Sequence, residues 1–197
     1  MVRTRSYDEN EVLTRAMHAF RREGYSGISI PQLETATGLS SGSIYNAYGD
    51  KRGIFLAAFE HYLHAVLERR IAEFAKPESG LAGVRRLFLT LLREPDGQTF
   101  GCLITNSAIE LHADSEISDS AVRRGFQILE HLFAERLAAA VSSGKLPKRF
   151  NPKAGAVRLL ALYQGVLVLI RGGYDLKAIR RAVEQEFDQL EGKSHDA

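Results

Sequence analysis

The chain has 197 residues, 45% of them hydrophobic, and a formal net charge of only +2 at pH 7. This length can bury a substantial core, and the weak net charge excludes binding to nucleic acid by bulk electrostatics alone. The single cysteine excludes an intramolecular disulfide framework, and the longest apolar stretch, residues 165–170, is too short to span a bilayer, so we expect a cytoplasmic protein without a membrane partner. The first predicted helix opens at Ser6, with Glu9 as its capping partner, and ends before Gly24.

Residues 28–48 are predicted to form two short helices joined by a tight turn. Ser29 and Gln32 fit a reciprocal capping box, Gly38 can end the first helix, and Ser40 can cap the second. A glycine-containing turn between two such helices is typical of a helix-turn-helix, which places its second helix in the major groove of DNA. The alternative is a tight helical corner in a protein of another kind.

A long amphipathic helix is predicted over residues 51–76, with Asp50 as its N-cap and Pro77 at its end. At the standard rise it would be about 38 Å long, enough to connect a DNA-binding domain to a separate body. Further helices are predicted at 81–93, 101–113, 116–142, 153–171 and 176–190. The predicted fold is therefore all-α, with about nine helices in two domains, residues 1–50 and residues 51–197.

Two segments of the chain resemble one known family. TGLSSGSIYNAYGDKRGIF, residues 37–55, is similar to the recognition segment of the TetR family of one-component bacterial repressors, and AFRREGYSGISIPQLETATGLS, residues 19–40, resembles the run before it. TFGCLITNSAIEL, residues 99–111, is similar to a GCL-x-x-N motif in a subset of that family. The resemblance implies an N-terminal three-helix helix-turn-helix domain followed by a helical ligand-binding and dimerisation domain. It also implies a transcriptional repressor that binds double-stranded DNA.

The second short helix of the motif carries no charged residue, so contacts to DNA would depend on close approach and on hydroxyl groups. The family commonly has a lysine or arginine where this chain has Ser41, and its absence should soften both affinity and salt dependence. The basic balance of residues 1–52 is also weak, with seven basic and six acidic residues. The residues predicted to contact DNA are Thr37, Ser41, Gly42, Ser43, Tyr45, Tyr48 and Lys51.

Cys102 is the candidate for chemical reactivity. It is predicted to lie in the first turn of a helix, where free N–H groups favour a thiolate, but its apolar neighbours favour the neutral thiol. Two interpretations therefore stay open: a small packed hydrophobic residue, or a thiol that senses electrophiles or oxidants. Some relatives with the GCL-x-x-N motif respond to such compounds through a cysteine at the matching place.

Binding of a small-molecule effector is predicted for the helical body, because helices of this kind can enclose an apolar cavity with a few polar groups. His61 and His64 are three residues apart, but no carboxylate or cysteine completes a ligand set with them, so neither a metal site nor a cofactor is expected. The predicted effector-binding residues are Phe59, Tyr62, Phe88, Cys102, Asn106, Phe126, Leu129 and Tyr163.

The last two helices are predicted to form a homodimer, because small and branched residues such as Ala161, Gly165 and Val168 allow helices to approach closely. The alternative is that they close the core of a monomer. A two-fold dimer would present two DNA-binding domains to a palindromic operator, with half-sites about 34–36 Å apart or a multiple of that distance. An effector that favours another spacing would release the operator.

Two other classes of protein remain as alternatives. A helical enzyme would need Cys102 as nucleophile beside a histidine base, and no spacing in the sequence brings such groups together, so we do not expect an enzyme. A binding module without a DNA partner would show no sequence-specific interaction with DNA at any salt concentration.

Overall fold

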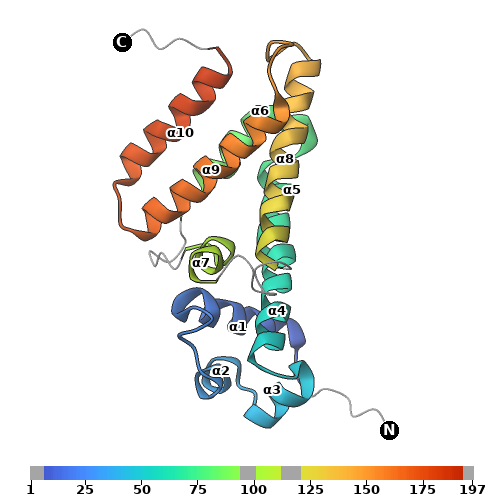
Figure 1. The fold of residues 1–197 in the computed structure, drawn as a ribbon, viewed down its shortest axis with the longest axis vertical. Helices are drawn as coiled ribbons and strands as arrows, with labels where there is room; N and C mark the ends of the chain where they lie inside the picture. The colour runs from blue at the N-terminus through green and yellow to red at the C-terminus, as the bar shows by residue number, and fades with distance from the viewer. Residues whose placement is uncertain (1–6, 94–100, 112–120, 193–197) are drawn as a thin grey trace. The chain divides into compact units, whose positions relative to one another are not determined.

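The protein is helical throughout the residues that the computed structural model describes, and Figure 1 shows the arrangement of these helices. The described residues are 7–93, 101–111 and 121–192. Over these ranges the helices form nine continuous runs, as the sequence predicted. The chain divides into two compact units, residues 1–68 with 102–124 and residues 69–101 with 125–197.

The first unit begins with three helices that pack around a small apolar core. Their bounds are α1 Glu9–Glu23, α2 Ile30–Thr37 and α3 Ser41–Tyr48. Met17 and Phe20 of α1, Leu33 of α2 and Ile44 of α3 are all buried. The helix α3 packs against α2 and against the helix that follows it, so the motif has a rigid support.

The ends of these helices are set by local hydrogen bonds. The reciprocal capping box of Ser29 and Gln32 is present, and Ser40 accepts a hydrogen bond from the N–H of Ser43, as predicted. The predicted start of α1 at Ser6 is wrong, because the carboxylate of Asp8 accepts hydrogen bonds from the N–H groups of the first turn and the helix begins at Glu9. A carboxylate one residue before the helix satisfies the free N–H groups as well as a serine does.

The long helix after the motif is continuous but not uniform. It consists of α4 Lys51–Tyr62, a π-helical segment η1 Leu63–Glu68 and α5 Arg69–Phe74, followed by a 3₁₀ turn, Pro77–Ser79. Asp50 caps its start, as predicted, by accepting a hydrogen bond from the N–H of Gly53 at 2.7 Å. The π-helical segment was not predicted, because apolar periodicity does not distinguish one wide turn from an α-helical turn.

The described part of the first unit also contains α7 Leu103–Glu110, which packs against α1. The sequence predicted this helix over residues 101–113. Gly101 and Cys102 instead precede it, Gly101 with a φ of +75° and Cys102 as the N-cap residue in extended conformation. Residues 112–113 lie outside the described residues.

The second unit is built around a cluster of aromatic rings. Besides α5 it contains four longer helices, α6 Gly80–Thr90, α8 Arg123–Ser142 (whose first two residues belong to the first unit), α9 Pro152–Arg171 and α10 Leu176–Leu190. The ring of Phe88 lies 5.1 Å from that of Tyr163, 5.4 Å from that of Phe187 and 5.7 Å from that of Phe133, measured between centroids. These rings come from α6, α8, α9 and α10, so one cluster joins the four helices.

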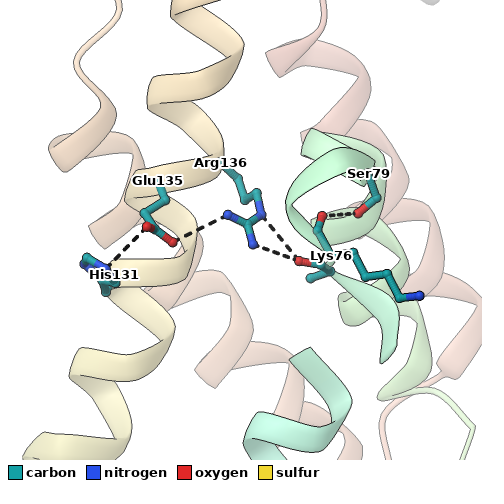
Figure 2. A network of polar contacts seen from close by, with 6 residues as sticks. Lys76, Ser79, His131, Glu135 and Arg136 are labelled. Atoms are coloured by element: carbon teal, nitrogen blue, oxygen red, sulfur yellow. Dashed lines mark hydrogen bonds and ion pairs between the residues drawn. The ribbon is translucent and has the colours of Figure 1, made fainter. Parts of the chain in front are cut away.

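Arg136 of α8 is buried and ties α8 to the end of the α4–α5 run. Its Nη2 and Nε atoms donate hydrogen bonds to the carbonyl oxygen of Ala75 at 3.1 and 3.4 Å, and Nη1 lies 3.5 Å from Glu135 (Figure 2). Ala75 directly follows α5, where carbonyl groups have no partner within the helix. The guanidinium group therefore caps the helix run from outside.

The α9 helix exposes more apolar surface than the other described helices. Val157, Val168 and Leu169 are 55%, 45% and 43% exposed. By length and composition alone α9 could cross a membrane, with a mean hydropathy of 1.5 over an 18-residue window of which 39% is buried. Helices that pack in the core of a protein pass the same test, so this property alone does not indicate a membrane. The exposed side chains of Val157, Val168 and Leu169 do show that one face of α9 is not covered by apolar residues of the same chain.

Candidate functional site

The candidate DNA-binding surface is the second helix of the motif, α3. Tyr45 is 51% exposed, and Gly42 is exposed with no atom within 4 Å of the position that a Cβ would take. The fold of the described residues therefore gives no internal reason for a glycine at position 42 or for an aromatic residue at position 45. Both features are available to a partner outside the protein.

The serines of α3 contribute to the start of the helix. The N–H of Ser41 donates a hydrogen bond to the carboxylate of Glu34 on α2, and hydrogen bonds from the side chain of Ser41 and then from its backbone N–H lower the pKa of Glu34. The Ser43 hydroxyl lies 2.9 Å from that of Ser40. Glu34 joins the two helices of the motif at the N-terminus of α3, and the sequence analysis did not identify it. The only signal in the sequence was an acidic residue six positions before Ser40, the predicted cap of this helix.

Two of the predicted DNA-binding residues are less exposed than predicted, Thr37 buried and Tyr48 half-buried. Thr37 is only 3% exposed, and its hydroxyl donates to the carbonyl of Leu33 at 2.6 Å while accepting from the N–H of Leu39 at 3.2 Å. Thr37 thus holds the turn between α2 and α3. Tyr48 is half-buried, with its hydroxyl oxygen out of solvent.

Lys51 lies at the first position of α4, over an aromatic ring. Its Nζ is 4.9 Å from the centroid of Tyr25, and the Tyr25 ring makes an edge contact with Phe55 at 5.0 Å. Burial, and then the carboxylate of Asp50, raise the pKa of Tyr25, so the phenol is neutral at physiological pH. The neutral ring and the ammonium group form a cation–π pair that restricts where Lys51 can reach.

The predicted effector residues are divided between the two units. Phe59, Tyr62, Cys102 and Asn106 belong to the first unit, and the other four belong to the second. Cys102 is 7% exposed, and the hydroxyl of Tyr62 donates a hydrogen bond to its sulfur at 3.1 Å. The amide of Asn106 donates to the carbonyl oxygen of Arg21 at 3.1 Å.

In the second unit, Phe88 and Tyr163 belong to the ring cluster, Leu129 is fully buried, and Phe126 is half-buried. A surface hollow of about 370 Å³ lies elsewhere in this unit. It is lined by Lys145, Pro147, Phe150, Arg158 and residues 189–192 at the end of α10. It includes none of the predicted effector residues.

The two histidines considered as metal ligands have other partners. Nε2 of His61 lies 2.8 Å from the hydroxyl of Thr14. His64, in the π-helical segment, lies between Glu60 and Glu68, at 2.7 and 2.6 Å. Within the described ranges no three His, Cys, Asp or Glu side chains are grouped as metal ligands would be.

Comparison with known families gives a match for each part of the chain. Residues 12–58 match the family described as bacterial regulatory proteins, tetR family, and residues 80–186 match the tetracyclin repressor-like C-terminal domain. The second match alone covers more than half of the chain. The chain belongs to the TetR family. It is a helix-turn-helix transcriptional regulator.

Relatives of this TetR-family chain are regulators in other bacteria. An uncharacterised HTH-type transcriptional regulator, YezE of Bacillus subtilis, is 36% identical over 154 residues, which is 74% of this chain and 76% of the relative. The HTH-type transcriptional repressor ComR of Escherichia coli is 23% identical over 181 residues, 90% of this chain and 86% of ComR. These matched relatives are transcriptional regulators, which is not an enzymatic role.

Solved structures of TetR-family regulators share the fold. A cysteine mutant of CifR, C99T-C181R, in complex with 26-bp operator DNA has a TM-score of 0.82 and 26% identity, covering 94% of this chain and 98% of that one. Reduced NemR of E. coli has a TM-score of 0.78 at 18% identity, covering 91% and 95%. The N-terminal helix-turn-helix and helical C-terminal domain predicted from the sequence are therefore confirmed.

Proposed function

We propose that this TetR-family chain is a transcriptional repressor that binds a palindromic operator as a homodimer and is released by a small-molecule effector. The observation that carries the proposal is the surface of α3, where Gly42 and Tyr45 are exposed on a helix that is capped at both ends by Ser40 and Gly49. A rigid helix with unused polar and aromatic groups on its outer face suits the major groove. Such a repressor acts in the cytoplasm, where its DNA is.

We assign the contacts to DNA as follows. Tyr45 and the hydroxyl groups of Ser41 and Ser43 reach base edges or phosphates, Gly42 allows the backbone to approach, and Lys51 contacts a phosphate. Thr37 and Tyr48 act from behind this surface, by holding the turn and the end of α3. Because α3 contributes no charge, the salt dependence of operator binding should be shallow for a TetR-type dimer.

The exposed face of α9 supports the homodimer. Val157 and Val168 are eleven residues apart, close to three helical turns, and Gly165 between them has open space around its Cα. Exposed apolar surface of this extent on one helix is typical of an interface between chains. Leu176 at the start of α10 is 45% exposed and adds to the apolar surface of the last two helices.

We further propose that residues 1–50 bind DNA and that residues 51–197 bind the effector and form the dimer. The effector residues remain those predicted from the sequence, Phe59, Tyr62, Phe88, Cys102, Asn106, Phe126, Leu129 and Tyr163. To switch the dimer completely, the effector must bind one conformational state about 5.5 kcal/mol more tightly than the other. Two effector sites per dimer can share this difference in binding free energy.

A second candidate mode of release is covalent modification of Cys102. The observation that favours it is the Tyr62 hydroxyl, which donates to the sulfur and would stabilise negative charge there. The proteins compared include CifR cysteine mutants solved on operator DNA, so cysteines were altered in a structural relative. This mode is supported if an electrophile abolishes operator binding of the wild-type protein while Cys102→Ser still binds the operator after the same treatment; equal loss in both proteins would contradict it.

The experiment for the main proposal is selection of genomic fragments by the purified protein at about 150 mM salt. We expect a palindromic site to be enriched, and its binding to be lost in Tyr45→Ala and Lys51→Ala. Lys76→Ala is the matched control for Lys51→Ala, because Lys76 is exposed and lies in the second unit. If no site is enriched, or if the control loses binding as well, the proposal is refuted.

A further inference from the structure

The N-cap residue of α7, Cys102, and two residues of the helix, Asn106 and Glu110, follow one another at intervals of four residues. Residues with this spacing lie above one another on a helix. The first accepts a hydrogen bond from Tyr62 of α4 at its sulfur, and the other two bind the backbone next to the helix-turn-helix. All of these contacts lie within the first compact unit.

Asn106 and Glu110 both act at the C-terminal end of α1. Asn106 Nδ2 donates to the carbonyl oxygen of Arg21 at 3.1 Å, in the last turn of the helix, where carbonyl groups lack helical partners. Glu110 accepts two hydrogen bonds in the turn that follows, at 2.8 Å from the N–H of Tyr25 and at 2.5 Å from that of Ser26. Together they fix both the end of α1 and the first residues after it.

The turn is shaped for the carboxylate of Glu110. Gly24 has φ +80°, a conformation that side chains rarely adopt, and a Cβ there would lie 2.8 Å from Oε2 of Glu110. A carboxylate that accepts from two successive N–H groups makes charge-assisted hydrogen bonds, which are stronger than neutral ones. The bound turn therefore has one preferred position relative to α7.

The turn that Glu110 fixes also positions Lys51, a residue that we propose contacts DNA. The ring of Tyr25 lies under Nζ of Lys51, at 4.9 Å, and against Phe55, with 5.0 Å between ring centroids. The backbone of Tyr25 is held by Glu110 and its side chain positions the ammonium group of Lys51. A continuous set of contacts thus runs from α7 to the first residue of α4.

We propose that Asn106 and Glu110 are positioning residues for operator binding. They hold the turn after α1, and through Tyr25 they hold Lys51 where it contacts the operator. This inference rests on the proposed function and adds to it the pair of side chains through which α7 acts on the DNA-binding helices. When the two anchors are lost, the turn samples several positions and operator binding weakens, although neither side chain touches DNA.

The test compares Glu110→Gln and Asn106→Ala with two controls in the full-length protein. Glu78→Gln makes the same change in charge at an exposed position of the second unit, and Ile109→Ala truncates a 72% exposed side chain on the same helix. Operator affinity is measured by fluorescence anisotropy over a range of salt concentrations. Hydrogen exchange of the peptide covering residues 24–27, the melting temperature and the mass of the dimer are measured on the same samples.

We expect Glu110→Gln and Asn106→Ala each to weaken operator binding about tenfold, which corresponds to about 1.4 kcal/mol. Exchange in residues 24–27 should become faster, and the slope of affinity against salt should become shallower because the phosphate contact of Lys51 is weakened, while the melting temperature and the dimer mass stay at wild-type values. Both controls should behave as wild type.

Unchanged operator affinity in Glu110→Gln and Asn106→Ala would overturn the inference, even if exchange in the turn increases. A loss of affinity that follows a lower melting temperature, or that the controls share, would overturn it too, because the role would then be general stability. Failure of the wild-type protein to bind any operator would instead refute the proposed function. The wild-type measurement alone therefore distinguishes failure of the proposed function from failure of the positioning inference.

Discussion

Truncation of Phe88 tests whether this residue belongs to the packed core or lines an effector cavity. Its side chain is fully buried, and its ring contacts the rings of Phe133, Tyr163 and Phe187. Replacing a buried phenylalanine by alanine costs about 3–5 kcal/mol, and each aromatic pair adds about 0.5–1.5 kcal/mol to what burial alone provides. With three ring partners, we expect Phe88→Ala to lose about 4–5 kcal/mol of unfolding free energy.

The loss is measured by urea unfolding, followed by circular dichroism because the chain contains no tryptophan. The protein concentration is kept constant, since the stability of a dimer depends on it. In thermal unfolding the same loss lowers the melting temperature by roughly 8–20 °C for a chain of this size. The control is Ile109→Ala, whose side chain is 72% exposed, and its stability should stay within about 0.5 kcal/mol of wild type.

A loss below about 1 kcal/mol would refute this reasoning, because the space around Phe88 would then be a cavity that tolerates removal of the ring. In that case Phe88→Ala should change the response to effector while the protein stays folded. The pair of measurements therefore separates the packing interpretation from the sequence prediction that Phe88 binds the effector.

Arg136→Met should reduce stability by about 1–3 kcal/mol in urea unfolding, because it leaves the carbonyl oxygen of Ala75 without its buried donor; wild-type stability would contradict the capping role. The hydrogen bond that the His64 ring donates to the carboxylate of Glu68, and then the charges of the neighbouring carboxylates, raise the pKa of His64 above its ordinary value, and Glu68→Gln should lower the midpoint of its NMR titration. Since the folded-state pKa is raised, this network stabilises the protein below the pKa of the unfolded chain and loses its contribution as pH rises through the folded value. An unchanged midpoint in Glu68→Gln would exclude the assigned cause. Val168→Glu should convert the dimer to monomers in light scattering, because it places a charge in the exposed apolar face of α9; a stable dimer would place the interface elsewhere.

Much of the helix-turn-helix could be predicted because its signals are local. Ser29, Gln32 and Ser40 act on N–H groups within three residues, so the sequence contains both partners of each hydrogen bond. The same logic failed at Ser6, because a second capping residue, Asp8, stands two positions later and the two compete for one helix end. Periodicity placed the buried residues Met17 and Ile44 correctly, since burial on one face repeats along a helix.

The candidate sites could be predicted only in part. The exposure of Tyr45 follows from the known geometry of the motif, whereas the burial of Thr37 depends on how the turn packs. Asn106 appeared as a polar residue in need of a partner, and the structure gives that partner as the carbonyl of Arg21, 85 residues away. Glu110 carried no distinguishing signal in the sequence, because an acidic residue near the end of a helix is normally solvated.

The sequence by itself determined the helices, the motif and the family, because caps, periodicity and recognition segments act over a few residues. Only the tertiary structure decided which distant groups meet: the three rings around Phe88, the guanidinium of Arg136 on Ala75, and the carboxylate of Glu110 on the turn after α1. Each of these contacts joins residues far apart in the chain, and its existence depends on packing that no local pattern encodes.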